Sequence, residues 1–366
     1  MDPHILDRLS CPVCGEPLAE TTAGNTRALR CPRRHTFDVA RQGYVNLLTG
    51  RAPHVGDSAE MVAARAEFQA AGHYDIISTA LAAAATEAVA RLRATPAPPT
   101  AAAPPAPTSA GAAPPAPTSA AAAPPAPTSA GAAPPALCSA STDATLSAPY
   151  CRVEGSRAKD ETTGVRSEQP AAGSDAYPLV VDAGAGTGRY LGAVLAALPD
   201  AVGLALDVSK PALRRAARAH PRAAAALADT WQRLPLADGV AAVLLNVFAP
   251  RNGPEFHRVL DRAGTLLVVT PADEHLTELV DALRLLRVDP DKADRVTATL
   301  GGHFTPVSST VHRAELTLTR PEIATLVGMG PSAWHTDPGA LAERLAALPE
   351  PVRVSVAVRL DAYRPR

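Results

Sequence analysis

The sequence has little lysine, little net charge and no long apolar run. Only three of its 35 basic residues are lysine, and the formal net charge is -1. The molecule as a whole therefore does not attract nucleic acid, and an RNA partner would need a local basic surface rich in arginine, which binds phosphate through a planar fork. No apolar run approaches the roughly 18 residues of a membrane span, and no basic stretch followed by an apolar run indicates a signal peptide. We expect a cytoplasmic protein with no membrane partner.

The five cysteines are unevenly placed, and an odd number with one tight cluster fits a metal site better than a disulfide framework. Cys11 and Cys14 are followed by Cys31 and His35 in the pattern C-x2-C-x16-C-x3-H. Four such ligands suit tetrahedral zinc and leave no open position, so we predict a structural Zn²⁺ site. So short a segment has little core of its own, and the metal would supply its folding free energy. Buried cysteines beside a surface histidine, or a redox Cys-x-x-Cys pair, are the alternatives.

Arginine is concentrated around the second half of this cysteine-rich segment. Five arginines lie between residues 27 and 41, and only Asp38 opposes them. A basic surface of this kind binds RNA phosphates, although a solvated face would have the same composition. We predict that RNA contacts are made by Arg30, Arg33, Arg34 and Arg41.

Composition divides the chain into four segments. Residues 1–57 are predicted to form a zinc-binding RNA-recognition module. Residues 58–94 are predicted to form two helices, beginning near Ser58 and Asp75, that precede the catalytic core. Residues 95–177 hold Pro-Pro-Ala-Pro-Thr-Ser-Ala repeats with no apolar face to bury, which predicts a disordered, partly polyproline II insert. A proline-rich ligand for a small recognition domain is the alternative interpretation of these repeats.

The fourth segment, residues 178–366, alternates short apolar runs with helical patterns. That alternation predicts an α/β fold, with a parallel sheet and crossover helices. The last two apolar runs, residues 307–318 and 352–360, are separated by a helix and predict an antiparallel hairpin at the edge of the sheet. In such sheets, ligands bind at the carboxyl edge of the strands.

Gly184, Gly186 and Gly188 form a glycine loop that follows a strand and opens a helix. Their GxGxG spacing differs from the GxGxxG of dinucleotide-binding proteins, so a nicotinamide or flavin nucleotide is the less favoured ligand. Asp207 ends the next strand, where a carboxylate can accept hydrogen bonds from both hydroxyls of a ribose. Asp229 follows a short third strand and could accept from an adenine amino group. A glycine loop followed along the chain by Asp207 and Asp229 resembles the pattern of class I S-adenosyl-L-methionine (SAM) methyltransferases, which have a Rossmann-like domain.

Several segments together resemble the RlmA family of 23S rRNA guanine-N1 methyltransferases, and in particular its Gram-positive, tylosin-resistance branch. The resemblance covers nearly the whole chain except the proline-rich insert. The zinc spacing and the Gly-Asp-Ser-Ala-Glu-Met and Gly-His-Tyr segments do not belong to methyltransferases in general. The matching segments are Cys11–Cys14, Cys31–Asp38, Gly43–Leu48, Gly56–Arg65, Ala71–Tyr74, Asp182–Gly188, Leu206–Lys210, Phe248–Pro250 and Thr270–Leu276.

The resemblance implies further cofactor contacts at Tyr74, at Tyr190 and Leu191 just after the glycine loop, and at His275. From the residues alone, Tyr74 could equally be a core residue and His275 an ordinary helix histidine. We expect Asp182 to hold the methionine end of SAM. We expect His275 to lie at the boundary between cofactor and substrate, which makes it our candidate for a catalytic residue.

The resemblance implies SAM-dependent methylation of N1 of a guanine in a 23S rRNA hairpin, of the guanine-748 type rather than the guanine-745 type. Macrolide resistance and a homodimer are further expectations from the same resemblance. Because N1 lies on the Watson–Crick edge, the guanine must be unpaired or flipped before it reacts. A small-molecule methyltransferase and a non-catalytic zinc RNA-binding protein are the alternatives. The zinc segment and its arginines argue against the first of these.

Overall fold

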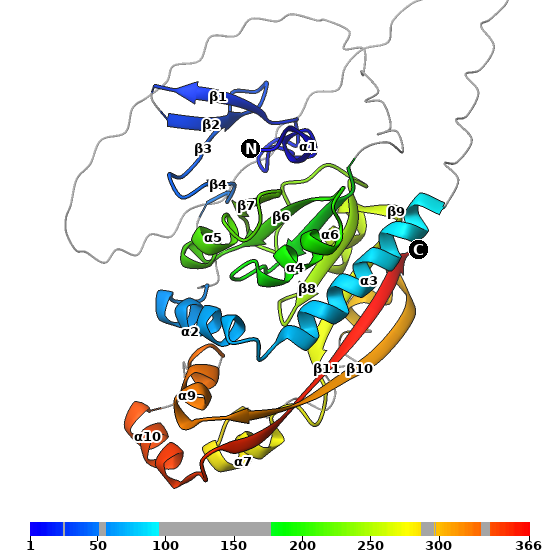
Figure 1. Ribbon diagram of the computed structural model, residues 1–366. Coiled ribbons are helices and arrows are strands. Elements are labelled where there is room, and N and C mark those ends of the chain that lie inside the picture. Colours follow the sequence, from blue (N-terminus) through cyan, green and yellow to red (C-terminus); the bar gives the residue numbers. More distant parts are fainter. Residues whose placement is uncertain (25, 51–55, 95–176, 287–295, 297, 331–336) are drawn as a thin grey trace, which may run out of the picture. The chain divides into compact units, whose positions relative to one another are not determined.

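An eight-stranded sheet forms the centre of the chain in the computed structural model (Figure 1). The structure describes residues 1–24, 26–50, 56–94, 177–286, 296, 298–330 and 337–366. The predicted proline-rich insert therefore lies outside the described residues, apart from Tyr177. The strands are β4 (Tyr44–Asn46), β5 (Leu179–Ala183), β6 (Val202–Asp207), β7 (Ala223–Leu227), β8 (Ala241–Val247), β9 (Leu260–Pro271), β10 (Phe304–Leu318) and β11 (Val352–Pro365).

The order of the strands in this sheet is β10-β11-β9-β8-β5-β6-β7-β4. The six strands from β9 to β4 in that order are parallel to their neighbours. Five of them come from the alternating segment 178–366, as predicted, whereas β4 comes from the N-terminal segment and was not predicted in this sheet. β10 and β11 form the predicted antiparallel hairpin, and β11 also pairs antiparallel with β9. The predicted α/β, Rossmann-like arrangement is confirmed, and the carboxyl ends of β5, β6, β7 and β8 share one edge of the sheet.

Three helices cover one face of the sheet, namely α3 (Asp75–Ala94), α4 (Arg189–Ala197) and α5 (Lys210–Ala216). The alanine-rich helix α3 forms because Ile77, Leu81 and Ala85 recur every four residues and make a buried stripe. The shorter helix α2 (Ala59–Ala70) precedes it, and Oγ of Ser58 caps α2 by accepting a hydrogen bond from the backbone N–H of Met61 at 3.2 Å. The two helices predicted within residues 58–94 are thus present.

The N-terminal segment covers the opposite face of the main sheet, and the two share one hydrophobic cluster. It consists of α1 (Pro3–Leu6) and a three-stranded antiparallel sheet of β1 (Ala19–Ala23), β2 (Thr26–Arg30) and β3 (Thr36–Asp38). Ile5, Leu9 and Leu29 are buried in one apolar cluster with Val181 and Leu204 of the main sheet. Helix α6 (Gly253–Val259) adds to the same cluster. Strand β4 then joins the main sheet beside β7.

The side chains of the central strands point alternately to the two faces of the sheet, and this explains why apolar groups cover both faces. Val180 belongs to the helix-covered cluster, whereas its neighbour Val181 belongs to the cluster that holds the N-terminal segment. Successive side chains of a strand point to opposite faces, so both faces of β5 must be covered by apolar groups. The N-terminal segment supplies part of that cover. The boundary predicted at residue 57 stays a prediction, because the two segments share this packing.

The long hairpin of β10 and β11 carries a group of helices at one end (Figure 1). These are α7 (Thr277–Leu283), α9 (Arg320–Gly328) and α10 (Pro338–Ala347). Helix α9 begins in a capping box of Thr319 and Glu322. Glu322 also lies 3.2 Å from Nε2 of His73, which ties α9 to the turn between α2 and α3. In the described part of the chain, no helix is both long enough and apolar enough to cross a membrane.

Candidate active site and zinc centre

A cleft opens at the carboxyl edge of β5, β6, β7 and β8, where the sequence predicts ligand binding. Its cavity has a volume of about 950 Å³, and α2, α7 and α9 contribute to its walls. The cavity brings together seven of the predicted cofactor residues, which are Tyr74, Gly184, Gly186, Tyr190, Asp207, Asp229 and His275.

The glycine loop adopts backbone conformations that favour glycine. Gly184 and Gly186 have left-handed φ values of 83° and 53°, a region that favours glycine. A Cβ atom on Gly184 would collide with Cβ of Ala249, and one on Gly186 would lie 3.3 Å from Nη1 of Arg65. Gly184 therefore needs glycine for its backbone conformation and for space, whereas Gly186 needs it for its backbone conformation, because the end of the Arg65 side chain can move.

Asp207 and Asp229 present anchored carboxylates to the cleft. Oδ2 of Asp207 accepts a hydrogen bond from the backbone N–H of Gly186 at 2.8 Å, and Oδ1 accepts from that of Ser209 at 2.8 Å. Oδ1 of Asp229 accepts from the backbone N–H of Trp231 at 2.9 Å. Burial raises the pKa of Asp207, and the two backbone N–H groups act in the opposite direction. Each oxygen keeps a second lone pair for a ribose hydroxyl or an adenine amino group.

Three of the predicted cofactor contacts do not line the cavity. Leu191 is fully buried in the apolar core, and a Cβ atom on Gly188 would lie 2.8 Å from Cα of Ala216 in α5. Asp182 is buried, and neither of its carboxylate oxygens has a hydrogen-bond partner in the described part of the chain. Burial and the charge of Asp207 raise the pKa of Asp182 to about 8, while the nearby backbone N–H of Leu191 acts in the opposite direction. Cofactor contacts of these three residues stay predictions.

The donors and acceptors at the polar end of the cleft fit SAM. Asp207 can accept from both hydroxyls of a ribose, and Asp229 can accept from an adenine amino group. The carboxyl group of Asp182 has no hydrogen-bond partner among the described residues, and its pKa of about 8 leaves it mostly protonated near pH 7. A positively charged ligand such as a sulfonium would favour its ionised form. When bound, this cofactor would supply an activated methyl group.

Aromatic rings form another wall of the same cavity. The ring centroids of Tyr74, Phe248 and His275 lie 6.2–6.4 Å from one another. Phe248 follows β8 with a left-handed φ of 52°, which is strained for a non-glycine residue, and its side chain is 41% exposed. The strained backbone therefore presents an aromatic ring to the cavity beside the cofactor residues.

The hydrogen bonds of His275 indicate which of its nitrogens carries hydrogen. The backbone N–H of Ala357 donates to Nδ1 at 3.3 Å, which occupies the lone pair of that nitrogen. The hydrogen of the neutral ring is then on Nε2, which lies 3.4 Å from Oη of Tyr74. Burial raises the pKa of Tyr74, so its hydroxyl stays protonated. Both side chains are arranged as hydrogen-bond donors, which argues against His275 as the base that accepts a proton.

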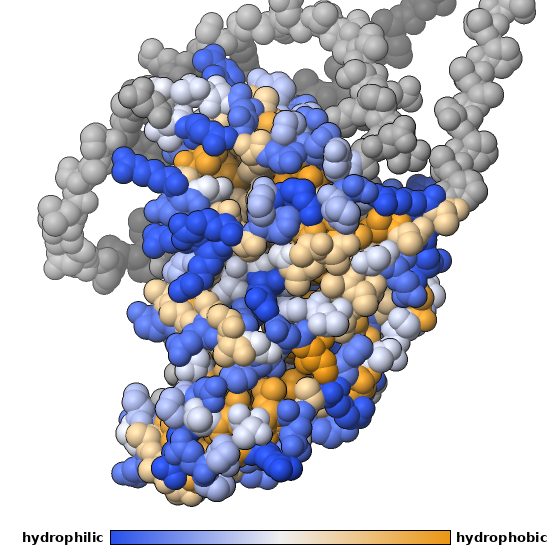
Figure 2. All heavy atoms as spheres, in the orientation of Figure 1, coloured by the Kyte–Doolittle hydropathy of each residue, from blue (hydrophilic) through white to orange (hydrophobic). Residues whose placement is uncertain are grey.

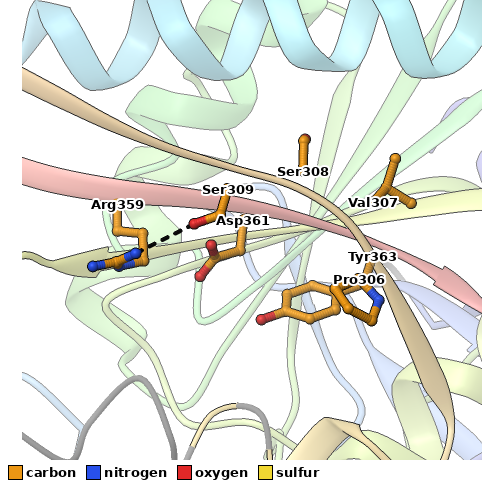
Figure 3. Close-up of a pocket in the computed structure, with 7 residues that line it drawn as sticks. All are labelled: Pro306, Val307, Ser308, Ser309, Arg359, Asp361 and Tyr363. Atoms are coloured by element: carbon orange, nitrogen blue, oxygen red, sulfur yellow. Dashed lines mark hydrogen bonds between the residues drawn. The ribbon is translucent and has the colours of Figure 1, made fainter.

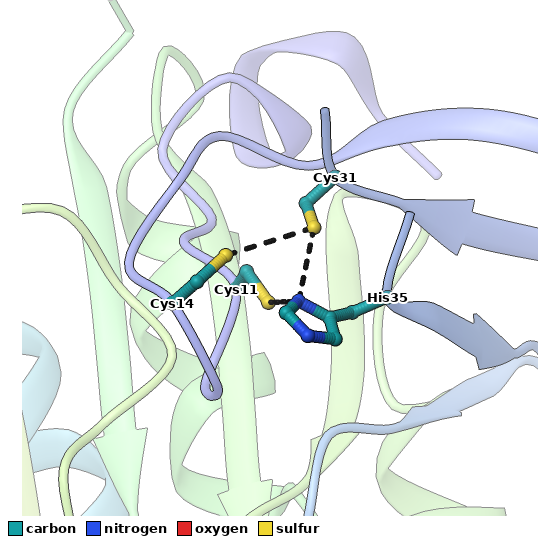
Figure 4. A group of neighbouring side chains, drawn as sticks. All are labelled: Cys11, Cys14, Cys31 and His35. Carbon is teal, nitrogen blue, oxygen red and sulfur yellow. Dashed lines mark hydrogen bonds between the residues drawn. The ribbon is translucent and has the colours of Figure 1, made fainter. Parts of the chain in front are cut away.

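The four predicted zinc ligands converge on one point (Figure 4). Their ligand atoms all lie within 4.8 Å of one another. Sγ of Cys14 lies 3.7 Å from Sγ of Cys31, and Nδ1 of His35 lies 3.6 Å from Sγ of Cys11 and 3.4 Å from Sγ of Cys31. A tetrahedral zinc ion with bonds of about 2.3 Å to sulfur requires sulfur atoms roughly 3.8 Å apart, so these spacings fit. The described ligands fill all four positions, as a structural site requires.

Comparison with known proteins gives the family. The model of the RlmA N-terminal zinc ribbon matches residues 9–51. A protein of Micromonospora griseorubida assigned as a 23S rRNA (guanine-N(1)-)-methyltransferase is 55% identical over 366 residues, which is 100% of both chains. The 23S rRNA (guanine(748)-N(1))-methyltransferase of Streptomyces fradiae is 40% identical over 365 residues, covering 100% of this chain and 99% of that protein. This chain belongs to the 23S rRNA (guanine-N1)-methyltransferase family. The predicted family and the zinc ribbon are confirmed.

The arginines that we predicted to contact RNA lie on the zinc ribbon of this methyltransferase. Arg33 and Arg34 are exposed on the knuckle that carries Cys31, and Nη2 of Arg33 lies 3.6 Å from Oε1 of Glu16. Arg41 is exposed on the loop that leads to β4, and Arg30 is half-buried at the end of β2. Their contacts with RNA stay predictions.

Two residues of the cleft had no role assigned from the sequence, although both lie in segments that resemble the RlmA family. Arg65 of α2 pairs with Asp57, and its Nη2 donates to the backbone O of Met329 at 2.8 Å. It thereby connects α2 to the end of α9. Phe248 was missed because the left-handed φ of a non-glycine residue follows from tertiary packing and has no signature in the sequence.

A second, smaller cavity of about 370 Å³ lies against the β10–β11 hairpin (Figure 3). In it, Nη1 of Arg359 donates to Oγ of Ser309 at 3.4 Å, and burial raises the pKa of Asp361. None of its described lining residues is a glycine or a predicted cofactor contact. We therefore assign the cofactor to the larger cleft. The smaller cavity is lined by Pro306, Val307, Ser308, Ser309, Arg359, Asp361 and Tyr363.

Proposed function

We propose that this chain uses SAM to methylate N1 of a guanine in a 23S rRNA hairpin, and that this guanine is of the 748 type. The observation that carries the proposal is the aromatic wall of Phe248, Tyr74 and His275, which shares one cavity with the acceptors for ribose and adenine. The name of the Streptomyces fradiae relative, at 40% identity, supports the position of the guanine. A homodimer, a cytoplasmic location and a role in macrolide resistance are carried over from the family as further proposals.

In this proposal, the residues of the cleft orient the guanine. The exposed ring of Phe248 stacks on an unpaired base, as aromatic side chains commonly do with RNA. With Nε2–H of His275 directed at Oη of Tyr74, the hydroxyl of Tyr74 is the free donor, so we assign it to O6 of the guanine and assign His275 to orient it. A donor at O6 stabilises the negative charge that develops there when N1 loses its proton. When bound, SAM would supply its methyl group to N1, and the N1 proton would pass to water.

Primer extension tests the reaction and its position together. The purified protein is incubated with SAM and a transcript of the 23S rRNA hairpin, and a reverse-transcriptase stop is sought, because N1-methylguanine cannot pair. A stop at the 748-type guanine is expected. A stop at the 745-type guanine would correct the position only. Absence of any stop, with SAM binding intact, would favour the small-molecule alternative. Absence of both methylation and SAM binding would favour the non-catalytic alternative.

Replacing Phe248 with alanine is expected to lower kcat/KM for the hairpin by about 5- to 150-fold, because base stacking on an aromatic ring is worth about 1–3 kcal/mol. The dissociation constant of SAM should stay near its wild-type value. Phe248→Trp should restore most of the activity, since it keeps an aromatic face. Equal losses in Phe248→Ala and Phe248→Trp would show that the position serves the shape of the cleft and not stacking.

A further inference from the structure

Helix α5 exposes a row of basic side chains. Lys210, Arg214 and Arg218 are spaced by four residues, so they lie on one side of the helix and its following turn over roughly 12 Å. Arg215 adjoins them, and all four side chains are exposed. The buried side of the helix is formed by Ala212, Leu213 and Ala216.

This row connects the cleft to the zinc ribbon. At the end of the row that begins with Lys210, the preceding residue Ser209 contacts the cleft: its Oγ donates to the backbone O of Asp57, which lines the cleft. At its other end, a Cβ atom on Gly43 would lie 3.6 Å from Cβ of Ala217, so the loop that carries the exposed Arg41 lies against the end of α5. Figure 2 shows hydrophilic side chains gathered over α5 and the neighbouring part of the ribbon.

Helix energetics alone do not account for these charges. Arg214 and Arg215 lie in the last turn, where positive charge compensates the helix dipole. Lys210, however, is the first residue of α5, where a positive charge opposes the dipole. The sequence has no acidic residue between Asp207 and Asp229. Among the ion pairs of the described residues, none involves a side chain of this row.

We propose that Lys210, Arg214, Arg215, Arg218 and Arg41 form one phosphate-binding strip, which holds the backbone of the RNA stem while the loop guanine enters the cleft. The strip rests on the proposed function, because it presumes an RNA substrate. Arginine forks match phosphate oxygens, and a linear row of them follows a sugar–phosphate backbone. The strip lies between the cleft and the ribbon, so it extends the predicted RNA surface of the ribbon to the reacting base.

Substitution of three arginines tests the strip. The variant combines Arg214→Gln, Arg215→Gln and Arg218→Gln, and its control combines Arg262→Gln, Arg353→Gln and Arg364→Gln. The control residues are exposed on β9 and β11, and their substitution removes the same three positive charges. Fluorescence anisotropy with the hairpin transcript measures the dissociation constant at several salt concentrations. Each lost phosphate contact lowers the salt slope by about one. We expect the slope to fall by about two to three and the affinity to fall on the order of 10- to 100-fold.

Several readouts separate the possible outcomes. The variant should keep the wild-type unfolding temperature, SAM affinity and kcat at saturating RNA, while its KM for RNA rises. A triple Arg→Lys variant, which keeps the charge, should restore most of the binding. If the triple Arg→Gln variant has the same RNA affinity and salt slope as the control, the proposed strip is wrong. The exposed side of α5 would then be a solvated face or a site for an acidic protein. If the wild-type chain neither binds nor methylates the hairpin, the proposed function itself fails.

Discussion

Replacing Cys31 with serine is expected to lower the unfolding temperature of this methyltransferase on the order of 10 °C and to weaken SAM binding. Structural zinc supplies folding free energy, so an incomplete ligand set destabilises the ribbon. The ribbon shares an apolar cluster with the main sheet, and its loss would expose Val181 and Leu204 to water. At about 2–4 °C per kcal/mol for a domain of this size, a loss of several kcal/mol gives a shift of this order.

Differential scanning calorimetry and SAM titration measure this effect, and chelation of zinc from the wild-type protein should reproduce it. Cys138→Ser is a matched control, because Cys138 lies far in the sequence from the four zinc ligands. The opposite result would be a Cys31→Ser protein with wild-type stability and SAM affinity but reduced RNA affinity. The ribbon would then be an independent RNA module, and its packing against the sheet would contribute little to stability.

Replacing Asp207 with alanine is expected to raise the dissociation constant of SAM on the order of 100-fold. In the proposed binding mode, the carboxylate accepts from two ribose hydroxyls, and a hydrogen bond to a charged group is worth about 1.5–3 kcal/mol. Two such bonds give at least about 3 kcal/mol, which is roughly 100-fold in affinity. The same carboxylate also holds the glycine loop through the backbone N–H of Gly186 at 2.8 Å, so its removal loosens that wall of the cleft.

Isothermal titration calorimetry with SAM measures this effect. Asp200→Ala is the matched control, because Asp200 is an exposed aspartate whose only described ion pair is with Arg93 at 3.5 Å. The control should bind SAM as the wild type does. An unchanged dissociation constant in Asp207→Ala, in a protein that remains folded, would remove Asp207 from the cofactor site and reopen the assignment of the cleft.

Much of the site could be predicted from the sequence because its parts are local. The zinc ligands come in two short pairs, Cys11 with Cys14 and Cys31 with His35, so the chain between them needs only to form a hairpin. The glycine loop follows its strand directly, and Asp207 ends the next strand. In a parallel sheet, strand ends meet at one edge, so these residues converge whatever the details of packing.

Other features depended on contacts between distant segments. From the sequence, Gly188 and Leu191 were predicted as cofactor contacts, but the packing of α4 against α5 and the core places them outside the cavity lining. The tautomer of His275 follows from the backbone N–H of Ala357, 82 residues away along the chain. A hydrogen bond of this kind depends on β11 lying beside the cleft, which no local pattern encodes.

The sequence by itself determined the zinc ligands, the α/β class and the placing of Asp207 and Asp229 at neighbouring strand ends, because residue type and short spacing are sufficient for each. Only the tertiary structure showed that the zinc ribbon shares an apolar cluster with the main sheet. It also decided that Phe248 faces the cleft and that the basic side of α5 continues to the ribbon at Arg41. The physical reason is the same in all three cases: burial of apolar surface from both faces of one sheet selects which distant segments meet, and the exposed residues follow from that packing.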